Sequence, residues 1–392
     1  MLTNTPTSER IHISIFGKTN AGKSSIFNAI TNQNISIVSD ISGTTTDPVK
    51  KTMEILPLGA VIVFDTAGID DNSELGLKRY QKTLEVLNKT DIALFVTDIN
   101  KQLENSEKEF IEKIKSKKIP YLIVYNKSDD NNSEKNGNEI ETSIKTGKNI
   151  ELLKNKIANL SPKKEKFIIS DRLNKFDTVI LVIPIDESAP KGRLILPQQL
   201  VLRELLDKMC TVICTQPDNL KNTLRNLKNP PQLVITDSQA FGIIKEIVPE
   251  TIKLTSFSIL FANYKGDLKT LVEGAKHILN LKDNDKVLIS EGCTHHRQCN
   301  DIGTVKIPKL IKNFTNKNID FDFTQGGEFP DDISKYNLIV HCGGCMLNEQ
   351  EMKSRLKKIT SKNIPVVNYG ILISYINGIL PRALEIFPEI MI

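Results

Sequence analysis

The chain has 392 residues, of which 39% are hydrophobic and 25% charged, and its formal net charge is +5. This length suits two or three domains, and the composition is that of a globular protein with real apolar cores. The 52 basic residues are nearly balanced by 47 acids, so the small basic excess does not indicate nucleic acid. No apolar run approaches the ~18 residues of a membrane helix. The first ten residues also lack a signal-peptide core, and we therefore expect a cytoplasmic protein without a membrane partner.

The first strongly informative segment is a phosphate loop. Residues 11–16 form a β-rich run that ends in Gly17-Lys18-Thr19-Asn20-Ala21-Gly22-Lys23-Ser24, a full G-x-x-x-x-G-K-S motif. Backbone N–H groups of such a loop wrap phosphates, and the helix that follows adds its dipole. Lys23 would reach the β- and γ-phosphates, and the Ser24 hydroxyl would bind Mg²⁺. The nucleotide-binding residues predicted from this segment are Gly17, Asn20, Gly22, Lys23, Ser24 and Ser25.

Three more segments follow in the order that a nucleotide-binding domain requires. Residues 43–48 form a polar loop able to act as a switch. A strand at 61–64 then delivers Asp65, which would hold the water shell of Mg²⁺, and Gly68, whose N–H would sense the γ-phosphate. A strand at 121–125 delivers Asn126, Lys127 and Asp129. The Asp129 carboxylate would accept N–H bonds from N1 and N2 of guanine, and Ser143 and Lys145 would complete the base pocket.

Taken together, residues 11–160 resemble the small GTPases of TrmE and Era type, which modify tRNA or assist ribosome assembly. The resemblance implies GTP and GDP as ligands and makes Thr45 the Mg²⁺-binding switch threonine, so that Lys23, Thr45 and Gly68 are the predicted catalytic residues. In this branch of GTPases, an Asn at the position of Asn20 together with a Gly-Thr-Thr switch segment implies hydrolysis stimulated by K⁺. Ile69 stands where Ras-like enzymes carry a water-orienting glutamine, so we expect slow turnover. A carboxylate such as Asp70, Asp71 or Glu74 would have to substitute for it.

The middle third carries structural signals without a motif for chemistry. A charged linker at 161–166 precedes a β-run at 178–185, a helix near 198–207 and strands at 211–215 and 233–236. This βαβαβ rhythm predicts a small parallel sheet with covering helices. We interpret the region as an interaction or dimerisation domain. Its two cysteines, Cys210 and Cys214, are expected to be buried core thiols.

Two cysteine-bearing segments dominate the last third. A strand at 286–290 runs into Cys293-Thr294-His295, and a strand at 336–340 runs into His341-Cys342-Gly343-Gly344-Cys345. If the sheet is parallel, both segments share the edge where open α/β sheets bind their ligands. Cys293, His295, Cys342 and Cys345 would make a closed zinc site. Three thiolates alone would instead hold an iron–sulfur cluster with one iron open, and the spacing does not separate these two readings.

The combination of a GTPase domain, a middle α/β domain and this Cys-x-His … His-Cys-x-x-Cys signature resembles the HydF family of [FeFe]-hydrogenase maturation GTPases over essentially the whole chain. The resemblance extends to the segments 189–193 and 301–308. It implies a [4Fe-4S] cluster on Cys293, Cys342 and Cys345. The fourth ligand is left open among His295, His341, Cys299, a nearby carboxylate and an exogenous group, and the two histidines could also lie outside the ligand set.

The resemblance also implies a role. A HydF-like protein is a scaffold and carrier for the di-iron precursor of the hydrogenase H-cluster, which it passes to apo-hydrogenase after two radical-SAM maturases supply the parts. It is expected to be a homodimer without a nucleic-acid partner. An RNA- or ribosome-associated GTPase with a structural zinc site is the alternative, although no KH-type Gly-x-x-Gly loop is found in a basic setting. A nickel or B12 metallochaperone would be expected to carry a histidine-rich tract, which five scattered histidines do not make.

The sequence thus predicts an α/β protein of three domains, in which a P-loop GTPase fold is followed by two smaller α/β domains with mainly parallel sheets. The GTPase domain is placed at 1–165, a dimerisation domain at 170–262 and a cluster-binding domain at 265–392.

Overall fold

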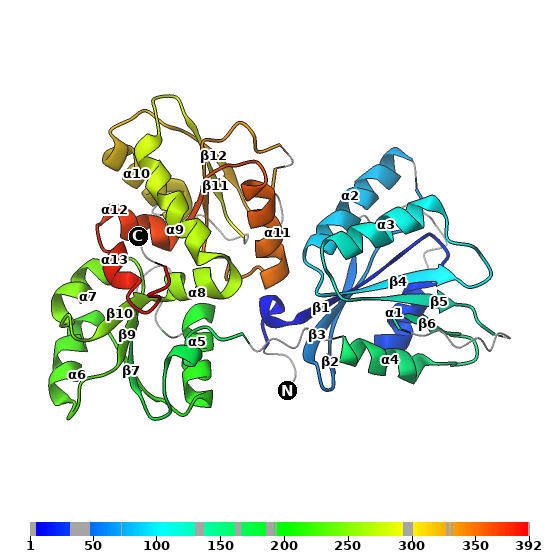
Figure 1. The fold of residues 1–392 in the computed structure, drawn as a ribbon, viewed down its shortest axis with the longest axis horizontal. Helices are drawn as coiled ribbons and strands as arrows, with labels where there is room; N and C mark the ends of the chain where they lie inside the picture. The colour runs from blue at the N-terminus through cyan, green and yellow to red at the C-terminus, as the bar shows by residue number, and fades with distance from the viewer. Residues whose placement is uncertain are drawn as a thin grey trace. The chain divides into compact units, whose positions relative to one another are not determined.

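The computed structural model describes residues 5–31, 48–71, 73–129, 137–160, 166–185, 192, 194–292, 301–326, 329–330 and 332–390. Thr45, Cys293, His295 and Cys299 are therefore outside the described residues. The chain divides into two compact units, Met1–Lys164 and Glu165–Ile392. The first unit contains one sheet and the second contains two (Figure 1).

The sheet of the first unit has the strand order β2-β3-β1-β4-β5-β6. Its strands are β1 (Ile11–Gly17), β2 (Val49–Ile55), β3 (Gly59–Asp65), β4 (Ile92–Asp98), β5 (Tyr121–Asn126) and β6 (Glu139–Glu141). All neighbours are parallel except β2, which pairs antiparallel to β3. The carboxyl ends of β1, β3 and β5 thus lie on one edge, and these are the strands that lead into the predicted nucleotide-binding segments.

Helices cover both faces of this sheet because successive side chains of a strand point to opposite faces. Ile13 and Ile15 of β1 belong to a core with α1 (Lys23–Thr31) and α4 (Ile150–Asn159). Phe16 belongs to the other core with α2 (Glu74–Asn88) and α3 (Asn105–Ser116). Since apolar side chains alternate into both cores, the central strands are buried on both faces, as parallel sheets require.

The first sheet of the second unit has the order β10-β9-β7-β8, with all strands parallel. Its strands are β7 (Thr178–Val182), β8 (Thr211–Thr215), β9 (Leu233–Thr236) and β10 (Lys253–Ser256). The helices that alternate with them are α5 (Leu196–Asp207), α6 (Leu220–Asn226), α7 (Phe241–Ile247) and α8 (Phe257–Lys265). The sequence predicted this βαβ order. Strand β7 starts where the predicted β-run starts, but it ends at Val182, three residues before the predicted end.

The second sheet of this unit has the order β12-β11-β13-β14 and is also fully parallel. Its strands are β11 (Lys286–Ser290), β12 (Asp320–Thr324), β13 (Leu338–His341) and β14 (Val366–Asn368). The helices are α9 (Leu268–Lys276), α10 (Ile307–Thr315), α11 (Glu349–Thr360), α12 (Tyr369–Ile376) and α13 (Leu380–Ala383). Asn348 and Asn368 cap α11 and α12 with side chains that accept backbone N–H bonds, which fixes where each helix begins.

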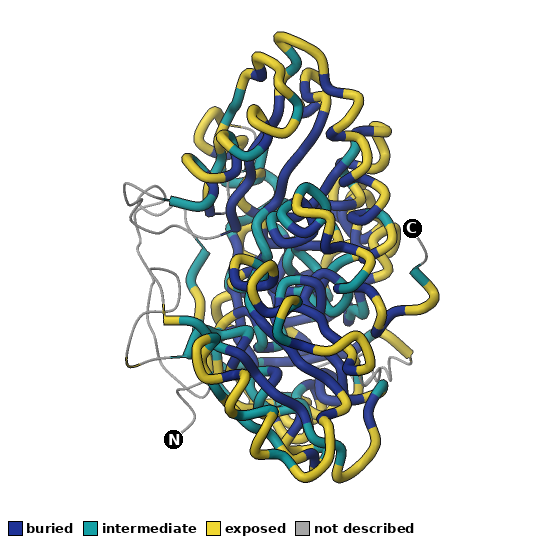
Figure 2. The backbone as a smooth tube through the Cα atoms, turned by 90° about the vertical axis from the view of Figure 1, so that its left-hand side faces the viewer, coloured by how far each residue is buried: buried dark blue, intermediate teal, exposed yellow. Residues whose placement is uncertain are grey.

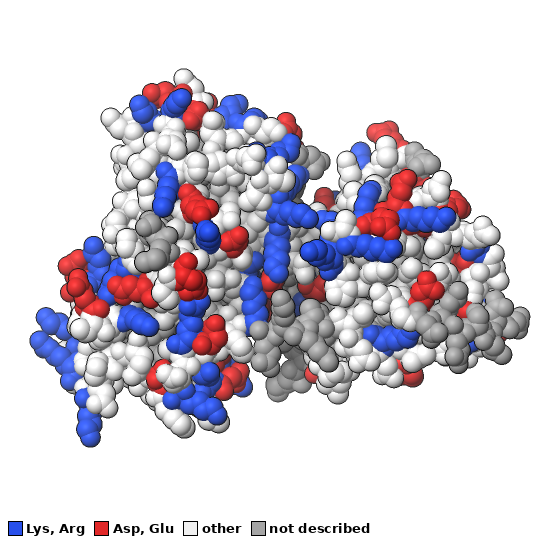
Figure 3. All heavy atoms as spheres, viewed as in Figure 1, with Lys and Arg blue, Asp and Glu red and all other residues white. Residues whose placement is uncertain are grey.

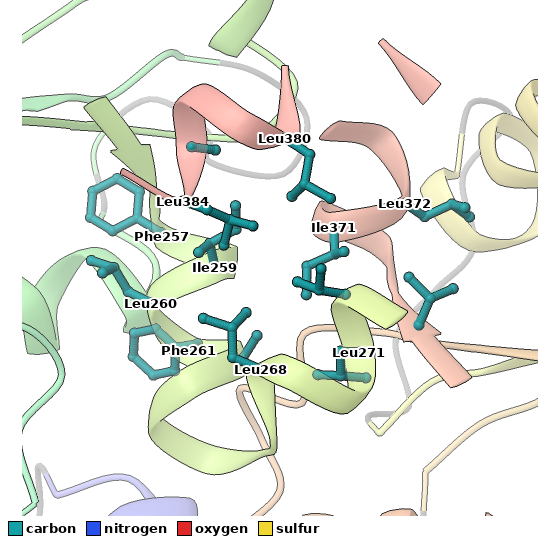
Figure 4. Packing of buried hydrophobic residues seen from close by; sticks show 14 of the residues in the cluster. Phe257, Ile259, Leu260, Phe261, Leu268, Leu271, Ile371, Leu372, Leu380 and Leu384 are labelled. Carbon is teal, nitrogen blue, oxygen red and sulfur yellow. The ribbon is translucent and has the colours of Figure 1, made fainter. Parts of the chain in front are cut away.

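One hydrophobic core joins the two sheets of the second unit. Figure 4 shows Phe261 of α8, Leu268 and Leu271 of α9 and Ile371 of α12 converging in one apolar layer. Gly274 of α9 lies so close to β14 that an added Cβ would be 1.8 Å from the carbonyl oxygen of Val366. In Figure 2 the buried stretches follow the strands, whereas exposed stretches follow outer helices and loops.

The predicted fold class is confirmed: the first unit is a P-loop GTPase fold, and two further sheets with parallel strands follow it. The separation of residues 170–262 from 265–392 as two domains stays a prediction, because their sheets share a core. The expectation for Cys214 is wrong, since Cys210 is buried but Cys214 is exposed on β8. Strand β8 is an edge strand, and only one of its sides is covered by a neighbour.

Within the described residues, none of the helices has the length and apolar character needed to cross a bilayer. Lysine and arginine are interspersed with acids over the face drawn in Figure 3, as the nearly balanced composition leads one to expect.

Candidate functional site

The phosphate loop between β1 and α1 depends on two glycines with positive φ. Gly17 has φ +143°, and a Cβ there would lie 2.1 Å from the carbonyl oxygen of Val96 on β4. Gly22 has φ +96°, and a Cβ there would lie 2.1 Å from Nδ2 of Asn126. Only glycine fits such positions without strain. The loop is therefore held tightly against the ends of β4 and β5.

A cavity of about 520 Å³ opens beside this loop. Its lining comes from the loop, from the end of β5 and from the segment after β6, and consists of Asn20, Gly22, Lys23, Ser24, Ser25, Asn126, Lys127, Asp129, Ile144 and Lys145. All of these except Ile144 were predicted from sequence as nucleotide-binding residues. Segments more than a hundred residues apart are thus brought to one pocket.

At one end of the cavity, a lysine, a serine and an aspartate meet. Lys23 is only 8% exposed, and its Nζ donates to the carbonyl oxygen of Lys18 at 2.7 Å. Ser24 Oγ donates to Oδ2 of Asp65 at 2.6 Å. Burial lowers the pKa of Lys23 and raises the pKa of Asp65. Within the described residues, Oδ1 of Asp65 is buried without a hydrogen-bond partner.

At the other end, Asp129 is held by two residues from the segment after β6. Ser143 Oγ donates to Oδ1 of Asp129 at 2.5 Å, and Nζ of Lys145 lies 3.7 Å from Oδ2. Asn126 Nδ2 donates to the carbonyl oxygen of Ala21 at 3.2 Å and so ties β5 to the phosphate loop. Lys127, with φ +66°, pairs with Asp98 at 2.8 Å.

The segment after β3 docks on the phosphate loop. Ile69 N donates to the carbonyl oxygen of Gly17 at 3.3 Å. A Cβ on Gly68 would lie 2.2 Å from Oγ1 of Thr19, so the predicted γ-phosphate sensor is in close contact with the loop. The predicted switch threonine, Thr45, lies outside the described residues.

The second candidate site is a tight turn at the carboxyl end of β13. Gly344 has φ +62° in this turn, as expected for glycine at a left-handed position. Cys342 Sγ accepts N–H bonds from Gly292 at 3.0 Å and from Gly344 at 3.4 Å. Gly292 lies two residues after the end of β11 and directly before Cys293, so this hydrogen bond joins the turn to the residue that precedes the first cysteine segment. The remaining predicted thiol, Cys293, lies outside the described residues.

Burial controls the protonation of both described thiols in this turn. It raises the pKa of Cys342 to about 11, against the two N–H bonds, which act in the opposite direction. It also raises the pKa of Cys345, which the charge of Lys265 opposes. Without a metal, both groups are therefore neutral thiols near pH 7. Among the described residues, no group of three histidine, cysteine or acidic side chains is placed to hold a metal ion.

Two buried cations flank the turn. Lys265, 2% exposed at the end of α8, donates from Nζ to the carbonyl oxygens of Cys345 at 3.2 Å and Leu347 at 2.9 Å. Arg355 of α11, 5% exposed, donates to the carbonyl oxygen of Gly326 at 2.8 Å and pairs with Glu351 at 2.9 Å. Lys265 thus holds the turn directly, and Arg355 contacts His341, the residue that leads into it.

A buried carboxylate completes the surroundings. Glu291, 4% exposed, lies between β11 and Gly292 and accepts a hydrogen bond from the hydroxyl of Tyr369 at 3.3 Å. A Cβ on Gly303 would lie 2.5 Å from Oε1 of Glu291, so the 301–308 segment packs against this carboxylate. Sequence reasoning did not assign Glu291, Tyr369, Lys265 or Arg355. Only Glu291 carried a signal, as an acid two residues before Cys293.

His341 uses both ring nitrogens inside the protein. The carbonyl oxygen of Cys342 lies 2.8 Å from Nδ1, and Nη1 of Arg355 lies 3.3 Å from Nε2. A neutral ring that donates from Nδ1 and accepts at Nε2 satisfies both contacts. Burial, with a further effect of Arg355, lowers the pKa of His341 from 6.5 to about 4.

The second unit is therefore expected to lose stability in mild acid. Since native His341 is held neutral, its contribution is present above pH 6.5 and is lost as the pH falls toward about 4. The shift predicts a loss of about 2 kcal/mol in the free energy of unfolding between about pH 7.5 and about pH 5. Denaturant unfolding of the full chain at both pH values measures it, with His341→Gln as the non-titrating comparison. Equal losses in both proteins would contradict the neutral-ring arrangement.

The fold and the first cavity define a P-loop GTPase to which a thiol-bearing α/β unit is added. Residues 12–127 match the family described as 50S ribosome-binding GTPase. Residues 168–266 match the Hydrogen maturase F dimerization domain, and residues 269–386 match the Hydrogen maturase F tetramerization domain. The chain belongs to the hydrogen maturase F (HydF) family. Both family domains of the second unit are named for oligomerisation, one for dimers and one for tetramers. The sequence analysis predicted a dimer and did not predict a tetramer.

Curated GTPases match a little less than half of the chain. GTPase Der of Mycoplasmopsis pulmonis is 37% identical over 178 residues, which are 44% of this chain and 39% of that protein. The tRNA modification GTPase MnmE of Desulforamulus reducens is 32% identical over 171 residues, 43% of this chain and 36% of the relative. This chain thus spans about two-fifths of these relatives. A solved structure of an Era variant from Aquifex aeolicus, 19% identical, covers 52% of this chain and 92% of its own, with a TM-score of 0.35.

Proposed function

We propose that this protein is a GTP-binding and GTP-hydrolysing scaffold that carries a [4Fe-4S] cluster and delivers the di-iron precursor of the H-cluster to apo-[FeFe]-hydrogenase. One observation carries the proposal. A nucleotide pocket of GTPase type and a pair of thiols joined by two glycines occur on one chain whose second unit matches the HydF domains over residues 168–266 and 269–386.

In the nucleotide pocket, Lys23 would bind the β- and γ-phosphates, and Asp129 would select guanine through its N1–H and N2–H. The contacts of Asp129 with Ser143 and Lys145 support this role, because they orient the carboxylate toward the cavity that it lines. Asn20, which has φ +62° and lines the same cavity, would supply an oxygen ligand to K⁺. We expect GTP hydrolysis to be slow, because Ile69 cannot orient water.

The residues present fit a Mg²⁺ ion. Ser24 and Asp65 lie together at the phosphate end, and the unpartnered buried Oδ1 of Asp65 is an oxygen that a metal-bound water would satisfy. Ser24 would bind the ion directly, Thr45 would complete its ligands, and Asp65 would hold its water shell.

The thiol site fits an iron–sulfur cluster. Cys342 and Cys345 would be two of its thiolate ligands, and Cys293, which follows Gly292, would be the third. The N–H bonds from Gly292 and Gly344 to Cys342 would stabilise a thiolate once a metal replaces the proton. Lys265 and Arg355 would offset the negative charge of the bound group. When bound, the cluster would supply an iron with an exchangeable position, to which the di-iron cargo attaches.

The described contacts of His341 favour a supporting role for this signature histidine. His341 would support the turn rather than ligate, since both its ring nitrogens have partners inside the protein. His295 remains a proposed fourth ligand or neighbour, and Glu291 is the nearby carboxylate that could take the same position.

We further propose that the nucleotide gates partner exchange and takes no part in cluster chemistry. GTP would act by ordering or releasing the loops at 43–48 and 65–75 and so change contacts with partners. The expected partners are apo-hydrogenase and the two radical-SAM maturases, and the expected assembly is at least a homodimer through residues 168–266.

Delivery is tested by transfer. Protein produced together with both maturases, then purified and mixed with apo-hydrogenase, is expected to generate hydrogen evolution, and protein produced without them is not. Cys342→Ala produced with the maturases should transfer nothing. Equal activation by the wild type and Cys342→Ala would contradict the carrier role.

A second function is an RNA- or ribosome-associated GTPase with a structural zinc site. The match of residues 12–127 to a ribosome-binding GTPase family favours it, whereas the HydF domains of the second unit do not. Tight binding of ribosomes, with zinc in the thiol site, would support this alternative.

A further inference from the structure

The carboxylate of Asp70 docks on the phosphate loop. Its Oδ1 accepts a hydrogen bond from the backbone N–H of Thr19 at 2.8 Å and another from the Thr19 hydroxyl at 2.9 Å. Thr19 directly precedes Asn20, which lines the nucleotide cavity. Gly68 leaves room for this contact, because a Cβ at residue 68 would lie 2.8 Å from both Oδ1 of Asp70 and the backbone nitrogen of Thr19.

The two neighbouring acids have other positions. Asp71 accepts from the N–H and the hydroxyl of Ser73 at 3.0 and 2.6 Å and lies 3.4 Å from Arg79. Ser73 in turn caps α2 by accepting from the N–H of Gly76. Glu74 is exposed in the first turn of that helix. Of the three acids that follow β3, Asp70 is thus the one joined to the phosphate loop in the described contacts.

Asp70 is anionic in this position. Burial raises the pKa of Asp70, but the hydrogen bonds from Thr19, a bond from its own backbone N–H and the charge of Lys18 together hold the pKa below its ordinary value. Its charge also acts on Lys23, the buried ammonium of the loop. A fixed negative charge therefore lies beside a loop that must receive negatively charged phosphates.

We propose that Asp70 is a specificity residue that lowers the affinity of the pocket for nucleoside triphosphates relative to diphosphates. A terminal phosphate adds negative charge near Lys23, and it would repel the neighbouring carboxylate of Asp70, which is partly exposed to solvent. A triphosphate must therefore displace Asp70 from Thr19, while a diphosphate leaves this contact in place. Because Asp70 is three residues from the cap of α2, its displacement would shift that helix. The inference rests on GTP binding by the first unit and not on the carrier role.

The test is the ratio of two dissociation constants, for GDP and for a non-hydrolysable GTP analogue, both with Mg²⁺. Asp70→Asn keeps the shape and an accepting oxygen but removes the charge. We expect it to raise affinity for the analogue about tenfold relative to GDP. Asp71→Asn, which removes an equal charge one residue away, should leave the ratio within about twofold of the wild type. An unchanged ratio in Asp70→Asn, or equal changes in both variants, would overturn the proposal.

A second variant and a reporter keep the test decisive if Asp70→Asn folds poorly. Thr19→Ala removes one of the two donors to Asp70 and should shift the ratio in the same direction, by about threefold.

The chain contains no tryptophan, so Leu77→Trp, at a position 59% exposed on α2, gives a single fluorescent reporter. It should respond to the GTP analogue and not to GDP. An equal response to both would contradict displacement of Asp70 by the terminal phosphate. Failure of GDP to bind at all would instead refute the GTP-binding assignment.

Discussion

Lys23→Ala is expected to weaken GTP and GDP binding about 100-fold. The ammonium of Lys23 is buried in the phosphate loop and is held in place by the carbonyl oxygen of Lys18. Its loss removes a charge-assisted contact to the phosphates, and about 3 kcal/mol corresponds to that change in affinity. Titration with fluorescent GDP measures the effect directly.

The matched control is Lys18→Ala in the same loop. The side chain of Lys18 pairs with Glu104 at 2.5 Å and does not line the nucleotide cavity, so its removal should change affinity less than about threefold. Lys23→Ala also tests gating. If the variant, already loaded with cargo, activated apo-hydrogenase as well as the wild type, the nucleotide could not act at delivery.

Lys265→Met is expected to destabilise the cysteine turn and to reduce cluster binding. Methionine fills a similar volume, but it leaves the carbonyl oxygens of Cys345 and Leu347 without the ammonium that they accept from. Losing these two bonds should cost about 3 kcal/mol in the free energy of unfolding of the second unit. Denaturant unfolding of the full chain, followed by iron analysis after reconstitution, measures both effects.

Lys269→Met on the exposed side of α9 is the matched control, and it should lie within about 0.5 kcal/mol of the wild type. Wild-type stability and full iron content in Lys265→Met would show that the buried lysine does not hold the turn.

The sequence was most informative where function depends on short segments at strand ends. The phosphate loop, Asp65 and Asp129 each follow a recognisable β-run, and the parallel sheet brings their segments to one edge. The same logic placed the cysteine turn after β13. These features are local in sequence, so spacing and residue type suffice to predict them.

The parts that sequence missed depend on contacts between distant segments. Lys265 reaches carbonyl oxygens eighty and more residues away, and nothing in its own neighbourhood distinguishes it from a surface lysine. Cys214 was expected to be buried because strand periodicity does not reveal that β8 is an edge strand. The different positions of Asp70 and Asp71, adjacent acids of equal charge, follow only from the fold.

The measurement that tests the central claim most directly is metal and sulfide analysis of the anaerobically purified and reconstituted chain, with EPR after reduction. Cys342→Ala is the test variant, and Cys210→Ala is a control that removes a buried thiol outside the turn. The account predicts about four irons and about four sulfides per chain, with a paramagnetic signal that Cys210→Ala keeps and Cys342→Ala loses. One zinc, no sulfide and no signal in the wild type would contradict it.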